Sequence, residues 1–484
     1  MRRPCVAAYY SHSLNSVNSA QNLHRHFAHT ATSNFTGIAV YYALAAGSPR
    51  IPRSFFVKNV DILTLGDELL LGLRQNAHLY YLGGEFARHG LPLRRNLVVR
   101  DAPEEIENAF RECWATADVV ITTGGLGPTS DDNTREAIAK VLGTPLEFDP
   151  AAEVAIVERF ARVGRRITDR DRKQCYRPRG AQLLRNNFGT APGIYLEKDG
   201  KILVMLPGPA NELRPMFENE ARPLLQEAGL LQTGEAYLQL RTAGLPEIQV
   251  ERRIQPIVDK YPGLGVAFCA HQGQVDVRIA PGARDFGPTQ LKDIGQEMRA
   301  VLNEDFVCFG HATLAEVVLD ELRARDATLA LAESCTGGLL ANAFTDIPGA
   351  SKSFLGGVVS YTNDAKVQLL DVPESLLDQH GAVSAEAAVA MVAGAVERFG
   401  ADYALSVTGF AGPDGGTVEA PVGTVYFGYS SPVGVWSHKM IFAGDRLTVK
   451  SRAVHAALDW MRRKLLKYMV EDLLAASTHA ETEG

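Results

Sequence analysis

The sequence Glu333-Ser334-Cys335-Thr336-Gly337-Gly338 decides how the C-terminal part of the chain folds. The apolar run 327–332 before it has the length of a buried strand. Apolar residues follow it at the spacing of one helix face: Leu339, Leu340, Ala343 and Phe344. Ser334 is therefore predicted to lie on a turn between a strand and a helix.

This turn carries the groups that acyl transfer needs. Gly337 and Gly338 let the backbone approach a ligand, and free N–H groups at a helix start favour negative charge. A hydroxyl at Ser334 beside such donors offers a nucleophile and an oxyanion hole. The alternative is a polar cap on a tight turn, because glycine turns are common in α/β folds.

Two further loops follow predicted strands. Segment 354–361 is an apolar strand that runs into Tyr361 to Lys366, and 403–408 is a buried strand followed by the glycine-rich segment 409–416. Ligands bind beyond the carboxyl ends of such strands, so the three loops are expected to form one site. The other predicted elements are helices over about 313–325, 385–398 and 447–468 and a strand pair at 422–429 and 435–442.

A serine nucleophile needs a base. His380 and His455 fall in helical or pre-cap segments, which disfavours a Ser-His-Asp triad. Lys366 is the predicted base, acting once burial or a nearby cation lowers its pKa and leaves the amine neutral. Tyr361 is predicted to relay or anchor the proton between Ser334 and Lys366. The alternatives are a solvated lysine at a helix start and a strand-end aromatic.

Two other side chains belong to this predicted site. Arg446 is expected to pair with a substrate phosphate, the alternative being a surface salt bridge with Asp445 or a neighbour. Cys335 is a second choice for the nucleophile, because buried inert thiols are common.

The segment 60–141 alternates strands and helices, which predicts a parallel sheet with helices on both faces. The expected elements are strands 60–65, 93–99 and 118–123, helices about 76–89 and 103–116, and a helix that begins near Asn133. A hairpin over 193–206 and a helix over 211–228 close this domain.

The loop after the third of these strands is a predicted phosphate site. Its glycines allow close backbone approach and a helix start follows; the predicted binding residues are Gly124, Gly125, Gly127 and Thr129. Asp131 and Asp132 are predicted to hold a divalent cation, the alternative being that both cap the helix. Glu68 and Asn76 are expected at the same end, near a sugar or the metal, with a solvated Glu and a capping Asn as alternatives.

Residues 237–309 predict a small α+β unit: strand 237–243, helix about 246–260, strands 264–270 and 274–280, and helix 288–303. An RNA-binding KH module would show a GxxG loop and basic surroundings, and neither is clear here. A spacer or dimerisation unit is predicted instead.

Composition sets the outer limits. A chain of 484 residues is expected to hold about three domains, and a net charge of −7 argues against a general nucleic-acid coat. Six scattered cysteines without a CxxC pair indicate a reducing, cytoplasmic setting, and no apolar stretch reaches transmembrane length. Residues 1–56 contain no Asp or Glu and have the composition of a disordered or targeting-like extension outside the fold.

The N-terminal motifs resemble the CinA family. Residues 123–129 with Asp131 and Asp132, after the loop 66–72, are similar to its molybdopterin-binding-like domain, as are 186–193 and 206–209. The resemblance implies metal-dependent ADP-ribose pyrophosphatase activity that gives AMP and ribose 5-phosphate, with a divalent metal such as Co or Mg together with K. It also implies that the two aspartates serve the metal and the phosphates. Asp67 stands where many relatives carry Thr, which bears on substrate detail.

The C-terminal motifs, spread over about 310–470, resemble the CinA C-terminal domain of the nicotinamide-mononucleotide deamidase family. The resemblance implies Ser334 as nucleophile and Lys366 as base, without a cofactor. The implied supporting residues are Tyr361, Glu333 and Thr408, and the implied substrate-binding residues are Thr336, Gly337, Gly338, Gly409, Gly412 and Arg446. Relatives do not all keep cysteine at the position of Cys335. The middle unit is similar to the KH-like insert of full-length CinA proteins.

The sequence thus predicts two α/β domains, 57–230 and 311–470, flanking a small KH-like α+β domain at 235–310, with a tail at 471–484. The predicted reaction is hydrolysis of nicotinamide mononucleotide (NMN) to nicotinic acid mononucleotide and ammonia, with ADP-ribose as a second substrate. A homodimer is expected, and no membrane or nucleic-acid partner. The alternative function is a non-catalytic pterin- or nucleotide-binding protein that acts through a protein partner in competence or the DNA-damage response.

Overall fold

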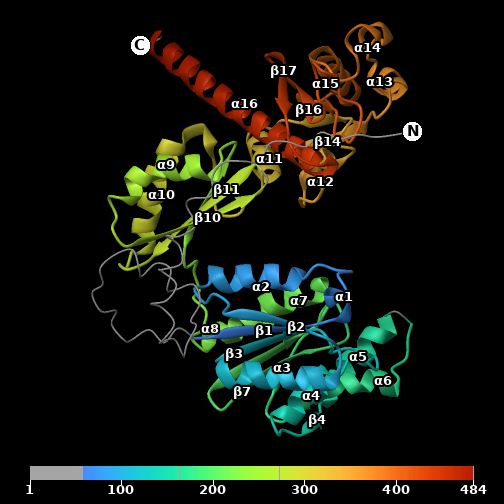
Figure 1. Ribbon diagram of the computed structural model, residues 1–484, viewed down its shortest axis with the longest axis vertical. Coiled ribbons are helices and arrows are strands. Elements are labelled where there is room, and N and C mark those ends of the chain that lie inside the picture. Colours follow the sequence, from blue (N-terminus) through green and yellow to red (C-terminus); the bar gives the residue numbers. More distant parts are fainter. Residues whose placement is uncertain (1–57, 163, 272, 483–484) are drawn as a thin grey trace, which may run out of the picture. The chain divides into compact units, whose positions relative to one another are not determined.

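The computed structural model describes residues 58–482 apart from 163 and 272, with side chains as far as Lys467. Three sheets of four or more strands form, each with helices packed on it (Figure 1), which confirms the predicted α/β class. The extension predicted over 1–56 lies outside the described residues. Within the described part of the chain, no helix is both long and apolar enough to span a membrane.

The first sheet has six strands in the order β2-β1-β3-β8-β7-β6. β1, β2, β3 and β8 run parallel, whereas β7 pairs antiparallel with both β8 and β6. The strands are β1 (Val60–Leu65), β2 (Arg95–Val99), β3 (Val119–Thr123), β6 (Gln182–Leu184), β7 (Gly193–Lys198) and β8 (Lys201–Leu206), and a separate pair is formed by β4 (Leu146–Phe148) and β5 (Tyr176–Pro178).

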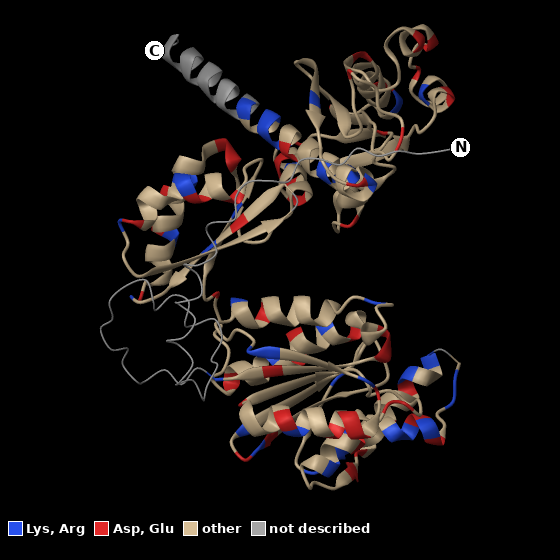
Figure 2. Ribbon diagram, in the orientation of Figure 1, with Lys and Arg blue, Asp and Glu red and all other residues tan. Residues whose placement is uncertain are grey.

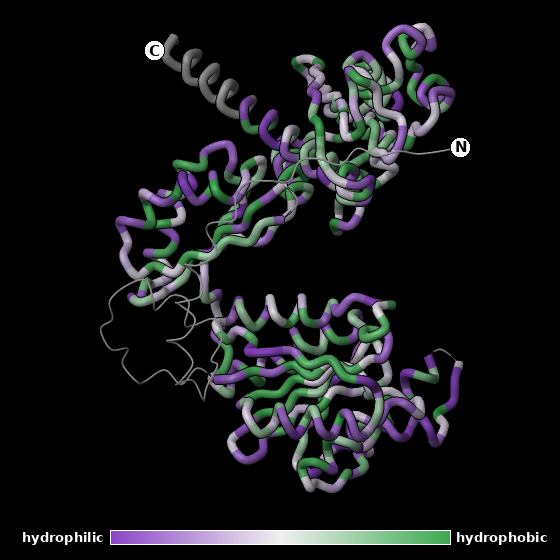
Figure 3. Tube along the Cα trace, in the orientation of Figure 1, coloured by the Kyte–Doolittle hydropathy of each residue, from purple (hydrophilic) through white to green (hydrophobic). Residues whose placement is uncertain are grey.

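Both faces of this sheet are covered. Ile62 of β1 packs in the core that includes α2 and α7, and its neighbour Leu63 packs in the core that includes α3 and α4. This double burial explains the nearly continuous apolar strands, which are largely green in Figure 3. The helices are α1 (Asp67–Leu70), α2 (Ala77–Arg88), α3 (Pro103–Thr116), α4 (Thr134–Val141), α5 (Pro150–Arg162), α6 (Asp169–Arg172), α7 (Ala210–Met216) and α8 (Arg222–Glu227).

The prediction of one helix over 211–228 was wrong in detail. α7 and α8 are joined by a π-helical turn, Phe217–Ala221. Pro223 lies at the start of α8 and has no N–H to donate to the preceding turn, so the regular α-helical bonding is interrupted there.

The middle sheet has the order β10-β11-β9-β12, with all neighbours antiparallel. The two helices of this unit pack on the sheet with apolar residues, such as Ile254 of α9 and Ile294 of α10. The last strand of this sheet, Phe306–Phe309, was not predicted. It has only four residues and directly follows a short 3₁₀ turn, Asn303–Asp305. The elements are β9 (Leu238–Ala243), α9 (Glu247–Val258), β10 (Leu264–His271), β11 (Gln274–Pro281), α10 (Pro288–Leu302) and β12 (Phe306–Phe309).

The C-terminal sheet has the order β14-β13-β15-β16-β17. β13 pairs parallel with β14 and β15, and β16 and β17 complete the sheet as an antiparallel hairpin. Residues of α11, α12 and α16 build the core on one face, and residues of α13, α14 and α15 build it on the other. α16 is longer than predicted and enters the segment 471–484 that was expected to be a tail.

The elements of this sheet are β13 (Leu329–Glu333), β14 (Phe354–Val359), β15 (Tyr403–Gly409), β16 (Thr424–Ser431) and β17 (Gly434–Ile441), with helices α11 (Leu314–Ala324), α12 (Leu339–Thr345), α13 (Asn363–Leu370), α14 (Glu374–His380), α15 (Ala385–Phe399) and α16 (Arg446–Thr482).

In both α/β sheets, the chain passes from one strand to a parallel neighbour on one side and then to a parallel neighbour on the other side: from β1 to β2 and β3, and from β13 to β14 and β15. The connections from such a strand leave in opposite directions, and a crevice opens at its carboxyl end. The loops that the sequence marks as functional follow β1, β3, β13, β14 and β15, so the topology brings each set to one sheet edge.

A pair of Gly→Ala substitutions tests this packing. A Cβ on Gly394 of α15 would lie 2.0 Å from the carbonyl oxygen of Leu370, whereas a Cβ on Gly84 of α2 finds no atom closer than 3.9 Å. Gly394→Ala is expected to cost about 1–3 kcal/mol, and Gly84→Ala to add about 0.5–1 kcal/mol from helix propensity. Differential scanning calorimetry should show a lower Tm for the first and no loss for the second; equal Tm values would contradict the packing of α15 on α13.

Candidate active site

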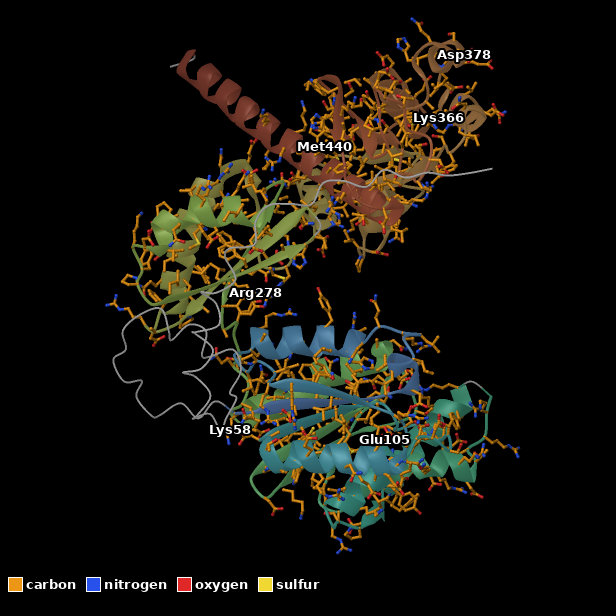
Figure 4. All side chains as sticks on the ribbon, viewed as in Figure 1. Lys58, Glu105, Arg278, Lys366, Asp378 and Met440 are labelled. Carbon is orange, nitrogen blue, oxygen red and sulfur yellow. The ribbon has the colours of Figure 1, made fainter. Side chains whose placement is uncertain are left out.

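Ser334 and Lys366 come together at the edge of the C-terminal sheet. Ser334 follows β13 directly, and Lys366 lies in the first turn of α13. Lys366 Nζ is 3.1 Å from Ser334 Oγ and 2.8 Å from the carbonyl oxygen of Ser360. Lys366, labelled in Figure 4, is only 1% exposed. The solvated-lysine alternative is therefore wrong.

Burial also sets the charge of this lysine. Removal from water disfavours the ammonium form and lowers the pKa of Lys366. No ion pair in the described part of the chain involves its amine, and the partners of Nζ are neutral oxygens. A neutral amine in contact with a hydroxyl can accept its proton, which is the task of a general base.

Glu333, the last residue of β13, holds the turn in place. Its buried carboxylate accepts hydrogen bonds from the N–H groups of Gly338 at 2.9 Å, Leu340 at 3.1 Å and Ala341 at 2.7 Å. These are donors at the start of α12 that would otherwise lack partners. Glu333 thus positions the turn that carries Ser334.

These bonds change the predicted oxyanion hole. The N–H of Gly338 is taken by Glu333, and the N–H of Gly337 donates to the Ser334 carbonyl at 3.1 Å. Of the turn's amides, those of Cys335 and Thr336 make no inter-residue backbone or side-chain bond to any other described residue. They are the better candidates to hold a developing oxyanion. The hydroxyl of Thr336 is buried and likewise has no partner within that range.

Tyr361 does not lie between the two dyad residues as predicted. Its hydroxyl accepts a hydrogen bond from Arg446 Nη2 at 2.6 Å, and the ring is 57% exposed. Since Ser334 and Lys366 are in direct contact, no relay is needed. Arg446 Nη1 also donates to the carbonyl of Gly412 at 2.7 Å, so this arginine ties two of the three loops together.

Thr408 and Gly409 support the third loop from within. Thr408 Oγ1 donates to the carbonyl of Ala382 at 2.6 Å, and a Cβ on Gly409 would lie 2.7 Å from the carbonyl of Thr424. Thr408 therefore holds the end of β15 through its hydrogen bond, and Gly409 holds it through close backbone packing. The alternative salt bridge between Arg446 and Asp445 does not form, because the Asp445 carboxylate accepts the N–H of Thr448 at 2.8 Å.

Cys335 is a poor nucleophile in this setting. The side chain is buried, and burial raises the pKa of its thiol to about 12. The thiolate is the reactive form of cysteine, so a thiol with this pKa is inert near neutral pH. The geometry favours the serine.

The predicted phosphate loop of the N-terminal domain needs its glycines. A Cβ on Gly125 would lie 2.0 Å from Thr134 Oγ1, and one on Gly127 would lie 2.5 Å from Asp132 Oδ2. Arg135 is fully buried beneath this loop and donates to the carbonyl of Leu126 at 3.1 Å. The loop therefore packs closely on Thr134 and Asp132, and only glycine fits at these two positions.

The two aspartates of this loop have different surroundings. Asp132 Oδ2 accepts the N–H of Thr129 at 2.9 Å and closes the loop on itself. Asp131 is exposed, and the Thr129 hydroxyl holds the pKa of its carboxyl below the usual range. The N-cap of α4 is Asn133, so the alternative that both aspartates cap this helix is wrong.

No group of three or more acidic, His or Cys side chains among the described residues could hold a metal ion. A protein-only cage is therefore not present in that range. Asp131 and Asp132 fit the other mode of binding, in which a cation such as Mg²⁺ takes one or two carboxylates and completes its shell with substrate phosphates and water.

The remaining predicted residues lie at the same edge. Asn76 Oδ1 accepts the N–H of Leu79 at 3.0 Å and caps α2, which is the alternative given for it. Asp101 was not predicted, yet burial and then the charges of Asp67, Glu68 and Asp131 raise its pKa. Glu68 is thus one of the charges that act on Asp101, which lies in a separate segment of the chain.

Two family models match the chain. A probable molybdopterin binding domain matches residues 61–227, and a CinA C-terminal domain matches residues 311–465. These spans contain the two α/β sheets and both sites described above.

Relatives match over nearly their whole length. A putative competence-damage inducible protein of Symbiobacterium thermophilum is 40% identical over 422 residues, covering 84% of this chain and 99% of its own. A CinA-like protein of Kosmotoga olearia is also 40% identical, over 409 residues, with 84% and 98% covered. A crystal structure of a CinA superfamily protein from Klebsiella pneumoniae is 36% identical and covers 32% of this chain and 96% of its own, with a TM-score of 0.31.

The chain is therefore an α/β protein that joins a domain matching the probable molybdopterin binding family to a CinA C-terminal domain. It belongs to the CinA family.

Proposed function

We propose that the C-terminal site hydrolyses the carboxamide of nicotinamide mononucleotide, giving nicotinic acid mononucleotide and ammonia. The observation that carries the proposal is the buried contact of 3.1 Å between Lys366 Nζ and Ser334 Oγ. Both residues are buried, and a lysine buried without a carboxylate partner is unfavourable unless its amine is neutral. A protein that only binds its ligand has no need of such an amine.

The reaction uses four groups of the turn and α13. Ser334 Oγ attacks the carboxamide carbon and Lys366 Nζ takes the hydroxyl proton. The amides of Cys335 and Thr336 hold the oxyanion of the tetrahedral intermediate. Lys366 returns the proton to the departing nitrogen, which leaves as ammonia. Water then attacks the acyl-enzyme, with the same lysine as base, and releases the acid.

The lowered pKa of Lys366 fixes the pH dependence of this chemistry. Above that pKa the amine is neutral and active as a base. As the pH falls through it, the amine gains a proton, and kcat/KM is lost with the base.

Two substitutions test the dyad. Ser334→Ala removes the nucleophile and Lys366→Met removes the base while filling the same space. Each is expected to lower kcat for ammonia release from NMN at least about a hundredfold, since such groups contribute about 10²–10⁴-fold. The measurement is coupled-enzyme detection of ammonia, with circular dichroism to check folding. Near-normal turnover in either folded variant would refute the mechanism.

We also propose that the N-terminal domain hydrolyses the pyrophosphate bond of ADP-ribose. The supporting observations are the glycine loop with no room for a Cβ and the ionised, exposed Asp131 beside it. Asp131 and Asp132 would hold a divalent cation, which supplies positive charge to the pyrophosphate when bound. The loop amides bind and orient the phosphates.

Asp131→Asn tests the second activity. The variant keeps the size of the side chain but loses its charge, and ADP-ribose hydrolysis is expected to fall about 10–100-fold, the worth of one charge-assisted contact. NMN deamidation in the same protein should not change. The matched control is Asp199→Asn, at an exposed turn between β7 and β8. Hydrolysis of ADP-ribose that persists after chelation of divalent metals would count against the proposal.

A further inference from the structure

Lys450 was not singled out by the sequence, yet it lies at the C-terminal site. It follows Arg446 by four residues on α16, so the two side chains share a helix face. A Cβ built on Gly337 would lie 3.4 Å from Lys450 Nζ, which places the amine over the turn that carries Ser334. Figure 2 marks the lysines and arginines of α16 in blue.

The amine of Lys450 forms no ion pair with any of the described side chains. Among residues 58–467, whose side chains the structure describes apart from 163 and 272, none forms an ion pair or hydrogen bond with its amine, and the side chain is only partly exposed. Arg446 is in a similar state, since its partners are a carbonyl and a phenol. The nearby Asp445 is used in capping α16. Two cations therefore lie beside the Ser334 turn and its neighbouring loops, and neither forms an ion pair with a described carboxylate.

A bound anion is the natural complement of this arrangement. Lys366 cannot supply the charge, because its buried amine is neutral when it acts as base. The Lys450 ammonium has three free donors, and Arg446 keeps further N–H groups beyond the two that are engaged. A phosphate monoester carries nearly two negative charges and accepts such bonds at all of its terminal oxygens.

We propose that Lys450, together with Arg446, binds the phosphate of the mononucleotide and makes the site specific for phosphorylated substrates. The inference rests on the proposed deamidase function and adds a residue to it. The φ of +63° at Gly337 would strain any side chain there, and a Cβ at this position would be in van der Waals contact with the Lys450 amine.

The test compares two substrates that differ only in the phosphate. Ammonia release from NMN and from nicotinamide riboside is measured for the full-length protein and its Lys450→Gln variant. Loss of one charge-assisted contact should raise KM for NMN about 10–100-fold with kcat nearly unchanged, and leave kcat/KM for the riboside as in the parent protein. Lys450→Arg should recover most of the affinity for NMN. The control is Lys467→Gln, an exposed lysine farther along the same helix, which should behave as the parent.

Two kinetic results would overturn the proposal. An unchanged KM for NMN in Lys450→Gln would show that the amine does not bind the phosphate. An equal loss of kcat on both substrates would show that Lys450 acts at the oxyanion or on the fold.

A binding measurement separates this proposal from the proposed activity. If the parent protein releases no ammonia from either compound, the deamidase function fails, and calorimetric titration with NMN and with nicotinamide riboside still tests the anion site. If the phosphate site exists, the parent protein binds NMN more tightly than nicotinamide riboside. The Lys450→Gln variant then binds the two compounds with equal affinity. Equal binding of the two compounds by the parent protein, or no NMN binding, would refute it.

Discussion

The C-terminal site depends on one interaction: a lysine amine buried against a serine hydroxyl with no carboxylate to keep it charged. Contact with water would stabilise the charged ammonium form of this amine, and a nearby Asp or Glu carboxylate would stabilise it more strongly. The fold removes both influences, and among the described residues the second hydrogen-bond partner of Lys366 Nζ is the carbonyl of Ser360. The proposed reactivity of Ser334 therefore depends on the packing around Lys366 rather than on any special local sequence.

The parallel sheet makes this packing possible. β13 lies between two parallel neighbours, and the segments that follow β13, β14 and β15 reach one edge of the sheet. Glu333 holds the first of them by accepting three backbone N–H bonds, and Arg446 joins the other two through Tyr361 and Gly412. Glu333 and Arg446 thus position the loops around the dyad. Neither side chain has a described hydrogen bond to Ser334 Oγ or Lys366 Nζ.

Local patterns predicted much of this. Apolar runs ended by glycines placed β13 and its turn, and the absence of a histidine in a comparable loop left Lys366 as the base. What failed depends on contacts between distant segments. Nothing local shows that Glu333 occupies the amide of Gly338, that Tyr361 turns to Arg446, or that Asp101 joins Glu68. The i, i+4 spacing of Arg446 and Lys450 was readable, but only the fold places that helix face over Gly337.

The most direct test of the account is the pKa of the Lys366 amine itself. It can be measured in the folded full-length protein by NMR titration of labelled lysine side chains, with Lys366→Met to assign the signal. The account predicts a value clearly below the value of about 10.4 for a solvated lysine. A Lys366 amine that titrates at or above that value would be charged at working pH, could not accept the serine proton, and would contradict the account.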